Sequence, residues 1–396
     1  MNVESANESN PIVCDRIAQK ISAHPQNRIT FAEYMETALY DSEGGYYSTH
    51  RPQIGAGGDF FTSPHLGRDF GELLATQFAQ MWELLGKPEP FTLVEMGAGQ
   101  GILAADIVGY FQRHCPEILP GLDYAIAEKS PSLQTEQQQR FRQLGAPFDT
   151  IRWCDLDELT EKSVTGCFFS NELVDAFPVH LVTRRDGQLQ EIYVTVKGDR
   201  EFVEVVGELS TPRLADYFQF VGIDLLSDAY PEGYRTEVNR AALDWMETVA
   251  GKLQRGFVLT IDYGYEADRF YSPTRREGTL QAYYRHRHHS DPYLYVGRQD
   301  LTAHVDFTAL ERKGRSLGLE TLGLTRQALF LIALGLGDRI AAVSRGEGGT
   351  LSEVLRRREA LHSLIDPMGL GNFGVLVQAT SGEKGLQLQG LSEPSR

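Results

Sequence analysis

The sequence predicts an α/β fold in which helices cover a parallel sheet. Between residues 91 and 171, apolar runs of strand type alternate with segments of helical periodicity, a pattern that parallel sheets produce. The run Phe91–Met96 enters the glycine-rich turn Gly97–Gly101, and a helical pattern begins at Ile102. A strand, a glycine-rich turn and a helix in this order are typical of nucleotide sites, because glycine lets the backbone approach a ligand closely.

The spacing of the glycines separates two classes of ligand. Dinucleotide-binding turns have the pattern G-x-G-x-x-G, in which the sixth residue is small. Here Gly97, Gly99 and Gly101 alternate, Ile102 takes the sixth position, and Glu95 precedes the turn. This arrangement is typical of S-adenosylmethionine-dependent methyltransferases with a Rossmann-like sheet. We therefore interpret Glu95 and the three glycines as methyl-donor-binding residues, with NAD binding and a structural tight turn as alternatives.

The next strand extends this site. Residues 123–127 form a second short apolar run that ends at Glu128. A carboxylate at this position can accept hydrogen bonds from both hydroxyls of a ribose. Glu128 could equally cap the helix expected after Ser130-Pro131, where proline suits the first helical turn.

A third strand is predicted over Ile151–Asp155. Asp155 lies at its end, where an adenine amino group would need an acceptor. Trp153 and Cys154 beside it either flank the adenine ring or are buried for packing alone.

Polar side chains also follow the fourth strand, which ends at Ser170. Asn171, Glu172 and Asp175 lie in a predicted helical turn that Pro178 interrupts. Ligands of open parallel sheets bind beyond the carboxyl ends of the strands, so we expect these side chains at the transferable methyl. Glu172 and Asp175 are three residues apart and are predicted on one face of the turn, which suits a guanidinium. Alternatively, Asn171 and Asp175 cap the turn.

The composition of the chain restricts the kinds of partner and the cellular location that we expect. Lys and Arg total 38 against 54 Asp and Glu, which gives a net charge of −16 and disfavours nucleic acids and anionic membranes. No apolar run approaches the roughly 18 residues of a membrane span. The four cysteines are far apart, which predicts reduced thiols and no metal site. The N-terminus resembles neither a secretory signal nor a transit peptide, so we expect a cytoplasmic protein without a bound metal.

The pattern along the chain predicts the domain organisation. The expected parts are a tail at 1–10, an N-terminal helical and lid region at 11–88, a main domain at 89–380, and a tail at 381–396. Two insertions are expected in the main domain, at about 179–232 and 263–304. The first is predicted to be antiparallel, because hairpin turns occur at Arg185-Asp-Gly and Lys197-Gly-Asp. The second is rich in Tyr, Arg and His but lacks metal-ligand spacing.

Four elements are expected after the first insertion: a helix over 237–253, a strand over 256–262, a helix over 307–317 and a final strand over 373–379. Two roles remain open for the segment that precedes the predicted helix over 307–317. Asp300, His304 and Asp306 could supply a general base, or Asp306 could cap the helix that starts at Phe307.

Five motifs together resemble the MidA-like family of bacterial and mitochondrial methyltransferases, and the similarity spans about residues 28–380. They are Ile54-Gly-Ala-Gly-Gly-Asp-Phe-Phe-Thr-Ser-Pro, Val94-Glu-Met-Gly-Ala-Gly-Gln-Gly, Asn171-Glu-Leu-Val-Asp-Ala-Phe-Pro-Val, Ile261-Asp-Tyr-Gly and Asp300-Leu-Thr-Ala-His-Val-Asp-Phe.

The resemblance implies a class I fold with a seven-stranded, mostly parallel sheet, and S-adenosylmethionine as the methyl donor. It also implies a protein arginine as acceptor, since the mitochondrial member dimethylates a core subunit of respiratory complex I and is needed for that complex's assembly. The matching positions are Gly97, Gly99 and Gly101 for the donor loop, Glu128 for the ribose, and Asn171, Glu172 and Asp175 for the motif after the fourth strand.

The N-terminal signature of the family matches Thr62, Ser63 and the glycines at 55, 57 and 58. We interpret it as a lid over the donor, with a packed interdomain turn as the alternative. The expected partner is therefore a protein that carries a methylatable arginine, and a homodimer is left open. A small-molecule methyltransferase and a non-catalytic assembly chaperone are the competing functions.

Overall fold

The computed structural model describes residues 8–49, 62–198, 201–285, 287–346 and 350–393. The chain divides into two compact units, each made of segments that are distant in the sequence. Unit 1 comprises residues 1–60, 174–245 and 264–312, and unit 2 comprises residues 61–173, 246–263 and 313–396. Both expected insertions therefore lie in unit 1, and the N-terminal region contributes to both units.

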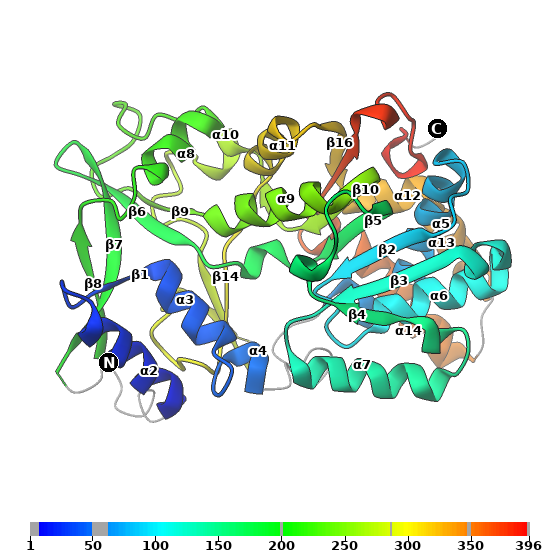
Figure 1. Ribbon diagram of the computed structural model, residues 1–396, viewed down its shortest axis with the longest axis horizontal. Coiled ribbons are helices and arrows are strands. Elements are labelled where there is room, and N and C mark those ends of the chain that lie inside the picture. The colour runs from blue at the N-terminus through cyan, green and yellow to red at the C-terminus, as the bar shows by residue number, and fades with distance from the viewer. Residues whose placement is uncertain (1–7, 50–61, 199–200, 286, 347–349, 394–396) are drawn as a thin grey trace. The chain divides into compact units, whose positions relative to one another are not determined.

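Unit 2 is built on a seven-stranded mixed sheet of order β16-β17-β10-β5-β2-β3-β4 (Figure 1). The four pairings among β10, β5, β2, β3 and β4 are parallel. The two pairings of β17, with β10 and β16, are antiparallel. The predicted α/β class is thus confirmed, with a mixed edge. The strands are β2 (Phe91–Met96), β3 (Leu122–Ala127), β4 (Arg152–Cys154), β5 (Val164–Asn171), β10 (Leu253–Asp262), β16 (Leu319–Arg326) and β17 (Gly374–Thr380).

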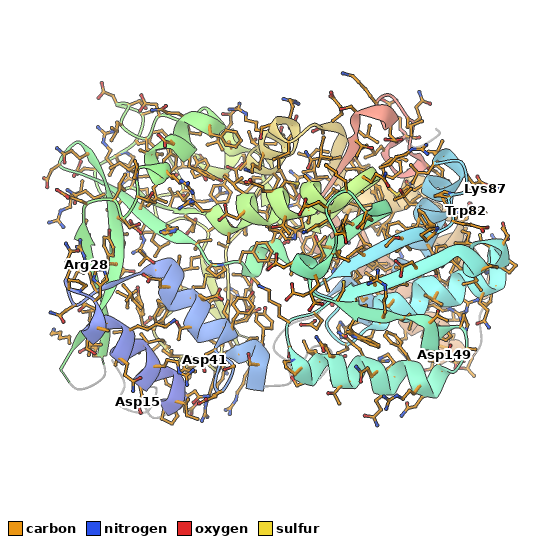
Figure 2. The ribbon with its side chains drawn as sticks, in the orientation of Figure 1. Asp15, Arg28, Asp41, Trp82, Lys87 and Asp149 are labelled. Atoms are coloured by element: carbon orange, nitrogen blue, oxygen red, sulfur yellow. The ribbon has the colours of Figure 1, made fainter. Side chains whose placement is uncertain are left out.

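Helices of unit 2 pack on this sheet around one apolar core. Phe78 on the helix α5 and Phe169 on β5 lie in that core, with their ring centroids 4.8 Å apart. At the end of α5, the Lys87 ammonium lies 4.8 Å from the ring centroid of Trp82 (Figure 2). The helices are α5 (Asp69–Leu84), α6 (Ile102–His114), α7 (Pro131–Leu144), α12 (Gln327–Ala333), α13 (Leu336–Ser344) and α14 (Leu351–Leu364), together with part of α9 (Arg240–Lys252).

Unit 1 contains a five-stranded sheet in which β1, β7, β6 and β9 are neighbours and β8 pairs with β7. All four pairings are antiparallel, so the predicted hairpin at Arg185-Asp-Gly is confirmed. The second predicted turn includes Asp199, which lies outside the described residues. The strands are β1 (Ile29–Thr30), β6 (His180–Arg185), β7 (Gln188–Lys197), β8 (Glu201–Gly207) and β9 (Arg235–Val238).

The remaining elements of unit 1 are short. A three-stranded sheet of order β13-β12-β14 and the parallel pair β11-β15 come from the second insertion and the residues that follow it. The strands are β11 (Gly264–Tyr265), β12 (Gln281–Tyr284), β13 (Arg287–His289), β14 (Asp300–Thr302) and β15 (Val305–Asp306). The helices are α2 (Pro11–Ala23), α3 (Phe31–Tyr40), α4 (Tyr46–Thr49), α8 (Arg213–Val221), α10 (Ala267–Phe270) and α11 (Phe307–Ser316).

Side-chain caps fix the starts of several helices. Thr30 forms a capping box with Glu33 at α3, Ser130 caps α7, and Asp306 accepts a hydrogen bond from the backbone N–H of Ala309 in α11. Each cap satisfies an amide that has no partner within its helix.

One predicted helix start is wrong. The helix expected from Glu237 begins at Arg240, because Glu237 and Val238 pair with β6 as part of β9. Asn239 accepts a hydrogen bond from the N–H of Ala242 and caps the helix instead. Strand pairing therefore overrides the helical periodicity of these residues.

In the described part of the chain, no single helix is long and apolar enough to span a membrane. The pair α12 and α13, bent by 76° relative to each other, passes the same length and composition test when taken together.

Candidate functional site

The glycine-rich turn between β2 and α6 needs its glycines for conformational reasons. Gly97, Gly99 and Gly101 have φ angles of +72°, +52° and +72°, in the left-handed region that other residues rarely adopt. A Cβ at Gly97 would lie 2.8 Å from Leu173 Cδ1, and a Cβ at Gly101 would lie 2.9 Å from Phe141 Cζ. The glycines therefore allow both the left-handed backbone of the turn and the close approach of neighbouring side chains, as a loop that binds a ligand through its backbone requires.

Glu95 lies within β2 and is buried. Its carboxylate accepts a 2.6 Å hydrogen bond from the Tyr124 hydroxyl. Burial raises the pKa of Glu95 to about 7, and the charge of Glu128 contributes to this rise. Because of the apolar surroundings of β2 and β3, this carboxyl group changes between its neutral and ionised forms near pH 7.

Glu128 contacts the residue before α7 but is not the cap of this helix, because the Ser130 side chain caps it. Its carboxylate accepts a 2.9 Å hydrogen bond from the N–H of Ser130, directly before α7. Burial raises the pKa of Glu128 to about 7, although hydrogen bonds from Ser130 and Gln137 oppose this rise. A partly buried carboxylate at the end of β3 remains suited to a ribose.

Asp155 follows β4 and is exposed. It accepts a 3.1 Å hydrogen bond from the N–H of Asp157 and thereby caps a 3-10 turn over Leu156–Glu158. This contact is local, and the adenine role of Asp155 stays a prediction.

The segment around Thr62 and Ser63 is tied to two neighbours within unit 2. Thr62 Oγ1 lies 2.6 Å from His65 Nδ1, and His65 Nε2 lies 3.0 Å from Oε1 of Gln100 in the glycine-rich turn. The N–H of Ser63 donates to the Glu172 carboxylate at 3.3 Å. Thr62 and Ser63 are buried. Gly55, Gly57 and Gly58 of the same signature lie outside the described residues.

Glu172 has an uncommon backbone conformation. Its φ is +53°, which strains a residue with a side chain and occurs preferentially at functional sites. The N–H of Glu172 donates to the Ile261 carbonyl at 2.9 Å. Its carboxylate accepts a hydrogen bond from Asn171 Nδ2 at 3.0 Å, in addition to the one from Ser63.

The predicted common face of Glu172 and Asp175 is wrong. The helical turn is confined to Val174–Ala176, and Glu172 precedes it in a left-handed conformation. The reason is that the sheet holds this backbone: β5 pairs with β10 up to Asn171, and the N–H of Leu173 donates to the Asp262 carboxylate. Glu172 belongs to unit 2, whereas Asp175 belongs to unit 1.

In unit 1, Asp175 lies among aromatic and acidic residues. Asp175 is 4% exposed and Asp300 is 2% exposed. The carbonyl of Asp175 accepts a hydrogen bond from the N–H of Ala303, and the Tyr47 hydroxyl donates to Asp300 at 2.8 Å. Burial raises the pKa of Tyr47, and the charges of Asp300 and Asp175 raise it further. The negative charges of two buried carboxylates therefore disfavour ionisation of the same phenol, that of Tyr47.

The segment at His304 and Asp306 favours the cap alternative. Asp306 caps α11 and accepts a 3.0 Å hydrogen bond from the Tyr217 hydroxyl, while burial raises its pKa to about 6. Burial lowers the pKa of His304 to about 4. His304 is therefore neutral near pH 7, and its role as a base stays a prediction.

Sequence reasoning missed the side chains that hold the glycine-rich turn from α7. Gln137 Nε2 donates to the Gly99 carbonyl at 2.7 Å, and Arg140 Nε donates to the Gln100 carbonyl at 2.9 Å. A signal was present in the sequence, because Leu133, Gln137 and Phe141 form the buried stripe of α7. A glutamine at a core position of an amphipathic helix indicates a buried polar contact.

The sheet order, the glycine-rich turn after β2 and the carboxylates at the ends of the following strands define the class of protein. A family model described as an S-adenosyl-L-methionine-dependent methyltransferase matches residues 73–325. The chain belongs to this methyltransferase family, and the left-handed turn after β2 fits the donor that the family uses.

The relatives that are similar in sequence carry names more specific than that of the family. The chain is 30% identical over 368 residues to the protein arginine methyltransferase NDUFAF7 homolog, mitochondrial, of Drosophila melanogaster, and this match covers 87% of the chain and 79% of the relative. It is 28% identical over 334 residues to protein arginine methyltransferase NDUFAF7, mitochondrial, of Homo sapiens, with coverages of 79% and 71%. These names do not support the cytoplasmic location expected from the sequence.

Two solved structures from Burkholderia thailandensis are also similar. One is bound to S-adenosyl-homocysteine and has a TM-score of 0.86 and 31% identity, with 100% of this chain and 98% of that chain covered. The other is a native crystal structure with a TM-score of 0.83, 29% identity and the same coverages. The methyl donor of this enzyme is therefore S-adenosylmethionine.

The described residues contain no group of three or more His, Cys, Asp or Glu side chains that could hold a metal ion. The cysteines Cys14, Cys115, Cys154 and Cys167 all lie within the described residues and form no disulfide bond.

Proposed function

We propose that this methyltransferase transfers a methyl group from S-adenosylmethionine to an arginine side chain of a partner protein. The observation that carries the proposal is the Glu172 carboxylate at the end of β5. The backbone of Glu172 has a strained φ of +53°, and its carboxylate accepts hydrogen bonds from Asn171 and Ser63. The next residue, Leu173, packs against Gly97 of the glycine-rich turn. A carboxylate beside the donor loop suits a cationic acceptor. The names of the relatives support the same acceptor.

The proposed donor site lies at the carboxyl ends of β2, β3 and β4. The glycine-rich turn approaches the donor through its backbone, Glu128 accepts hydrogen bonds from the ribose, and Asp155 accepts one from the adenine. We assign Glu95 to the base of the turn, and Thr62 and Ser63 to a segment that closes over the donor. The assignments of Glu128 and Asp155 follow from their positions directly after β3 and β4. The assignment of Thr62 and Ser63 is supported by their hydrogen bonds to His65 and Glu172.

The proposed acceptor residues act by alignment and charge. When bound, the donor would supply an electrophilic methyl group to the acceptor nitrogen. The carbon–sulfur electron pair would stay with sulfur as S-adenosylhomocysteine leaves, and the methylated nitrogen would release its proton to solvent. We assign Glu172 the role of orienting the guanidinium and offsetting its positive charge, and Asn171 the role of fixing the Glu172 carboxylate. Asp175 is a second candidate acceptor residue, taken from the sequence motif that it shares with Glu172. Alignment of this kind lowers the barrier because the reacting atoms no longer need to find one another.

A labelling experiment tests the acceptor class. The purified chain is incubated with S-adenosylmethionine that carries a labelled methyl group and with a protein extract of cells that lack this gene. Label in methylated arginine after protein hydrolysis is the expected result. The candidate acceptors include a core subunit of a complex I-type respiratory assembly, as the resemblance implies.

Two other outcomes would contradict the proposal. Label only in the small-molecule fraction would indicate a small-molecule methyltransferase. Donor binding without any transfer would indicate a non-catalytic assembly protein. The Glu172→Gln variant serves as the matched control, because it keeps the size of the side chain and removes its charge.

A further inference from the structure

The side-chain amide of Gln137 contacts two segments of the proposed donor site, the glycine-rich turn and β4. Gln137 is on α7 and is fully buried. Its Nε2 donates to the Gly99 carbonyl at 2.7 Å, and its Oε1 accepts from the Trp153 indole at 2.7 Å. Gly99 follows β2 and Trp153 belongs to β4, so one amide joins segments on either side of β3.

The orientation of this amide is fixed by its partners. An indole N–H can only donate a hydrogen bond and a backbone carbonyl can only accept one. Oε1 must therefore face Trp153, and Nε2 must face Gly99. The glutamine amide offers both a donor and an acceptor at this length without a charge. An apolar replacement would remove the hydrogen-bond partner of two half-buried groups, the Gly99 carbonyl and the Trp153 indole N–H, which is costly.

The same side chain also contacts two further parts of the site. A Cβ at Gly101 would lie 3.1 Å from Gln137 Cγ, so the aliphatic part of Gln137 packs against the end of the glycine-rich turn. Gln137 also favours the charged form of Glu128 and so opposes the rise in the pKa of that carboxyl group caused by burial. Arg140, one turn later on α7, supports the Gln100 carbonyl.

We propose that Gln137 is a positioning residue for donor binding. It acts through Gly99 and Trp153 and sets the spacing between the glycine-rich turn and the segment that follows β4 before the donor arrives. The inference rests on the proposed donor site and is independent of the acceptor.

The test replaces the amide and measures donor binding in the full chain. Gln137→Met keeps the length of the side chain and removes both hydrogen bonds. We expect its dissociation constant for S-adenosylmethionine, measured by calorimetry, to rise at least tenfold. The turnover at saturating donor should stay within threefold, because the residue does not touch the reacting atoms. Gln139→Met, at an exposed position of the same helix, should bind the donor like the wild type.

Two further variants test the hydrogen bonds to Gly99 and to Trp153 separately. Gln137→Glu retains an acceptor for Trp153 and, at alkaline pH where the new carboxyl group is ionised, has no donor for Gly99, so under these conditions it should also weaken donor binding at least tenfold. If Gln137 acts through Trp153, then Trp153→Phe should add less than twofold to the dissociation constant in the Gln137→Met background. Fully additive effects would overturn the inference.

Comparison with variants of the proposed donor site distinguishes a wrong assignment of that site from a wrong role for Gln137. If Gly99→Val and Glu128→Ala bind the donor normally, the donor site itself is wrongly assigned. If both lose binding while folded Gln137→Met stays within twofold of the wild type, the role of Gln137 is refuted and the donor site stands.

Discussion

The Tyr124 hydroxyl donates a 2.6 Å hydrogen bond to the Glu95 carboxylate, and both side chains are buried. The pair joins β2 to β3 directly before the glycine-rich turn. Because burial outweighs this hydrogen bond, the pKa of Glu95 is raised from 4.5 to about 7. The pair therefore links the stability of the proposed donor site to pH.

The first prediction concerns this stability. An acid whose pKa is raised on folding binds more protons in the folded state, so its contribution to stability falls as the pH rises from about 4.5 through 7. Glu95→Gln keeps an acceptor for Tyr124 and removes the buried charge. We expect the variant to be more stable than the wild type by about 1–3 kcal/mol at pH 8 and similar to it at pH 5. Urea denaturation at both pH values measures this, and a variant less stable at pH 8 would contradict it.

The second prediction concerns donor affinity. A neutral Glu128 can no longer accept hydrogen bonds from both ribose hydroxyls, and its pKa is raised to about 7 by burial. The affinity for S-adenosylmethionine should therefore increase by roughly tenfold between pH 6 and pH 8, as the ionised fraction rises. Calorimetric titration across this range measures the effect. Glu128→Gln should bind more weakly and show a flatter dependence, and an unchanged slope would remove Glu128 from the ribose site.

The third prediction concerns the glycine-rich turn. Gly99→Val places a branched side chain in the left-handed region at a φ of +52°, and it should weaken donor binding at least tenfold, or about 1.4 kcal/mol. Gly86→Val is the control, because Gly86 has a φ of +81° with open space around it and follows α5. Both variants carry similar backbone strain, so equal donor affinities in two folded variants would refute the loop assignment.

The fourth prediction concerns the acceptor. Asp175→Asn should keep donor affinity within a few-fold and lower methyl transfer about 100-fold, equivalent to about 2.7 kcal/mol. Transfer of labelled methyl to protein and calorimetric donor titration are measured on the same preparation. Loss of donor binding would place Asp175 in the donor site, and full transfer would make it structural.

The fifth prediction uses the strain at Glu172. Replacement by glycine relieves a left-handed conformation that costs about 1 kcal/mol or more for a residue with a side chain. Glu172→Gly should thus be at least as stable as the wild type to thermal unfolding while methyl transfer is lost. A clear loss of stability would indicate that the contacts with Asn171 and Ser63 serve the fold alone.

Much of unit 2 could be predicted from the sequence, because its signals are local. The alternation of apolar runs from Phe91 to Asn171 defined the strands, and the left-handed φ angles at Gly97, Gly99 and Gly101 require the residue type that made the turn recognisable. In unit 1, the cap of Asp306 on the helix that starts at Phe307 could be anticipated for the same reason, since it joins residues three positions apart in the chain.

The candidate site was predicted less completely. Helical spacing suggested that Glu172 and Asp175 share one face, but the pairing of β5 with β10 holds Glu172 in another conformation. Glu237 has a helical neighbourhood in the sequence and still belongs to β9, because β6 pairs with it. In both places a strand partner distant in the chain overrides the local preference.

The sequence by itself determined the family, the donor turn and the residue types at the strand ends, since those properties depend on neighbouring residues. Only the tertiary structure decided that Gln137 joins Gly99 to Trp153, that Tyr124 pairs with Glu95, and that burial raises the pKa values of Glu95 and Glu128. The physical reason is that hydrogen bonding between distant segments and exclusion of water arise only when the strands and helices pack, and no local pattern records them.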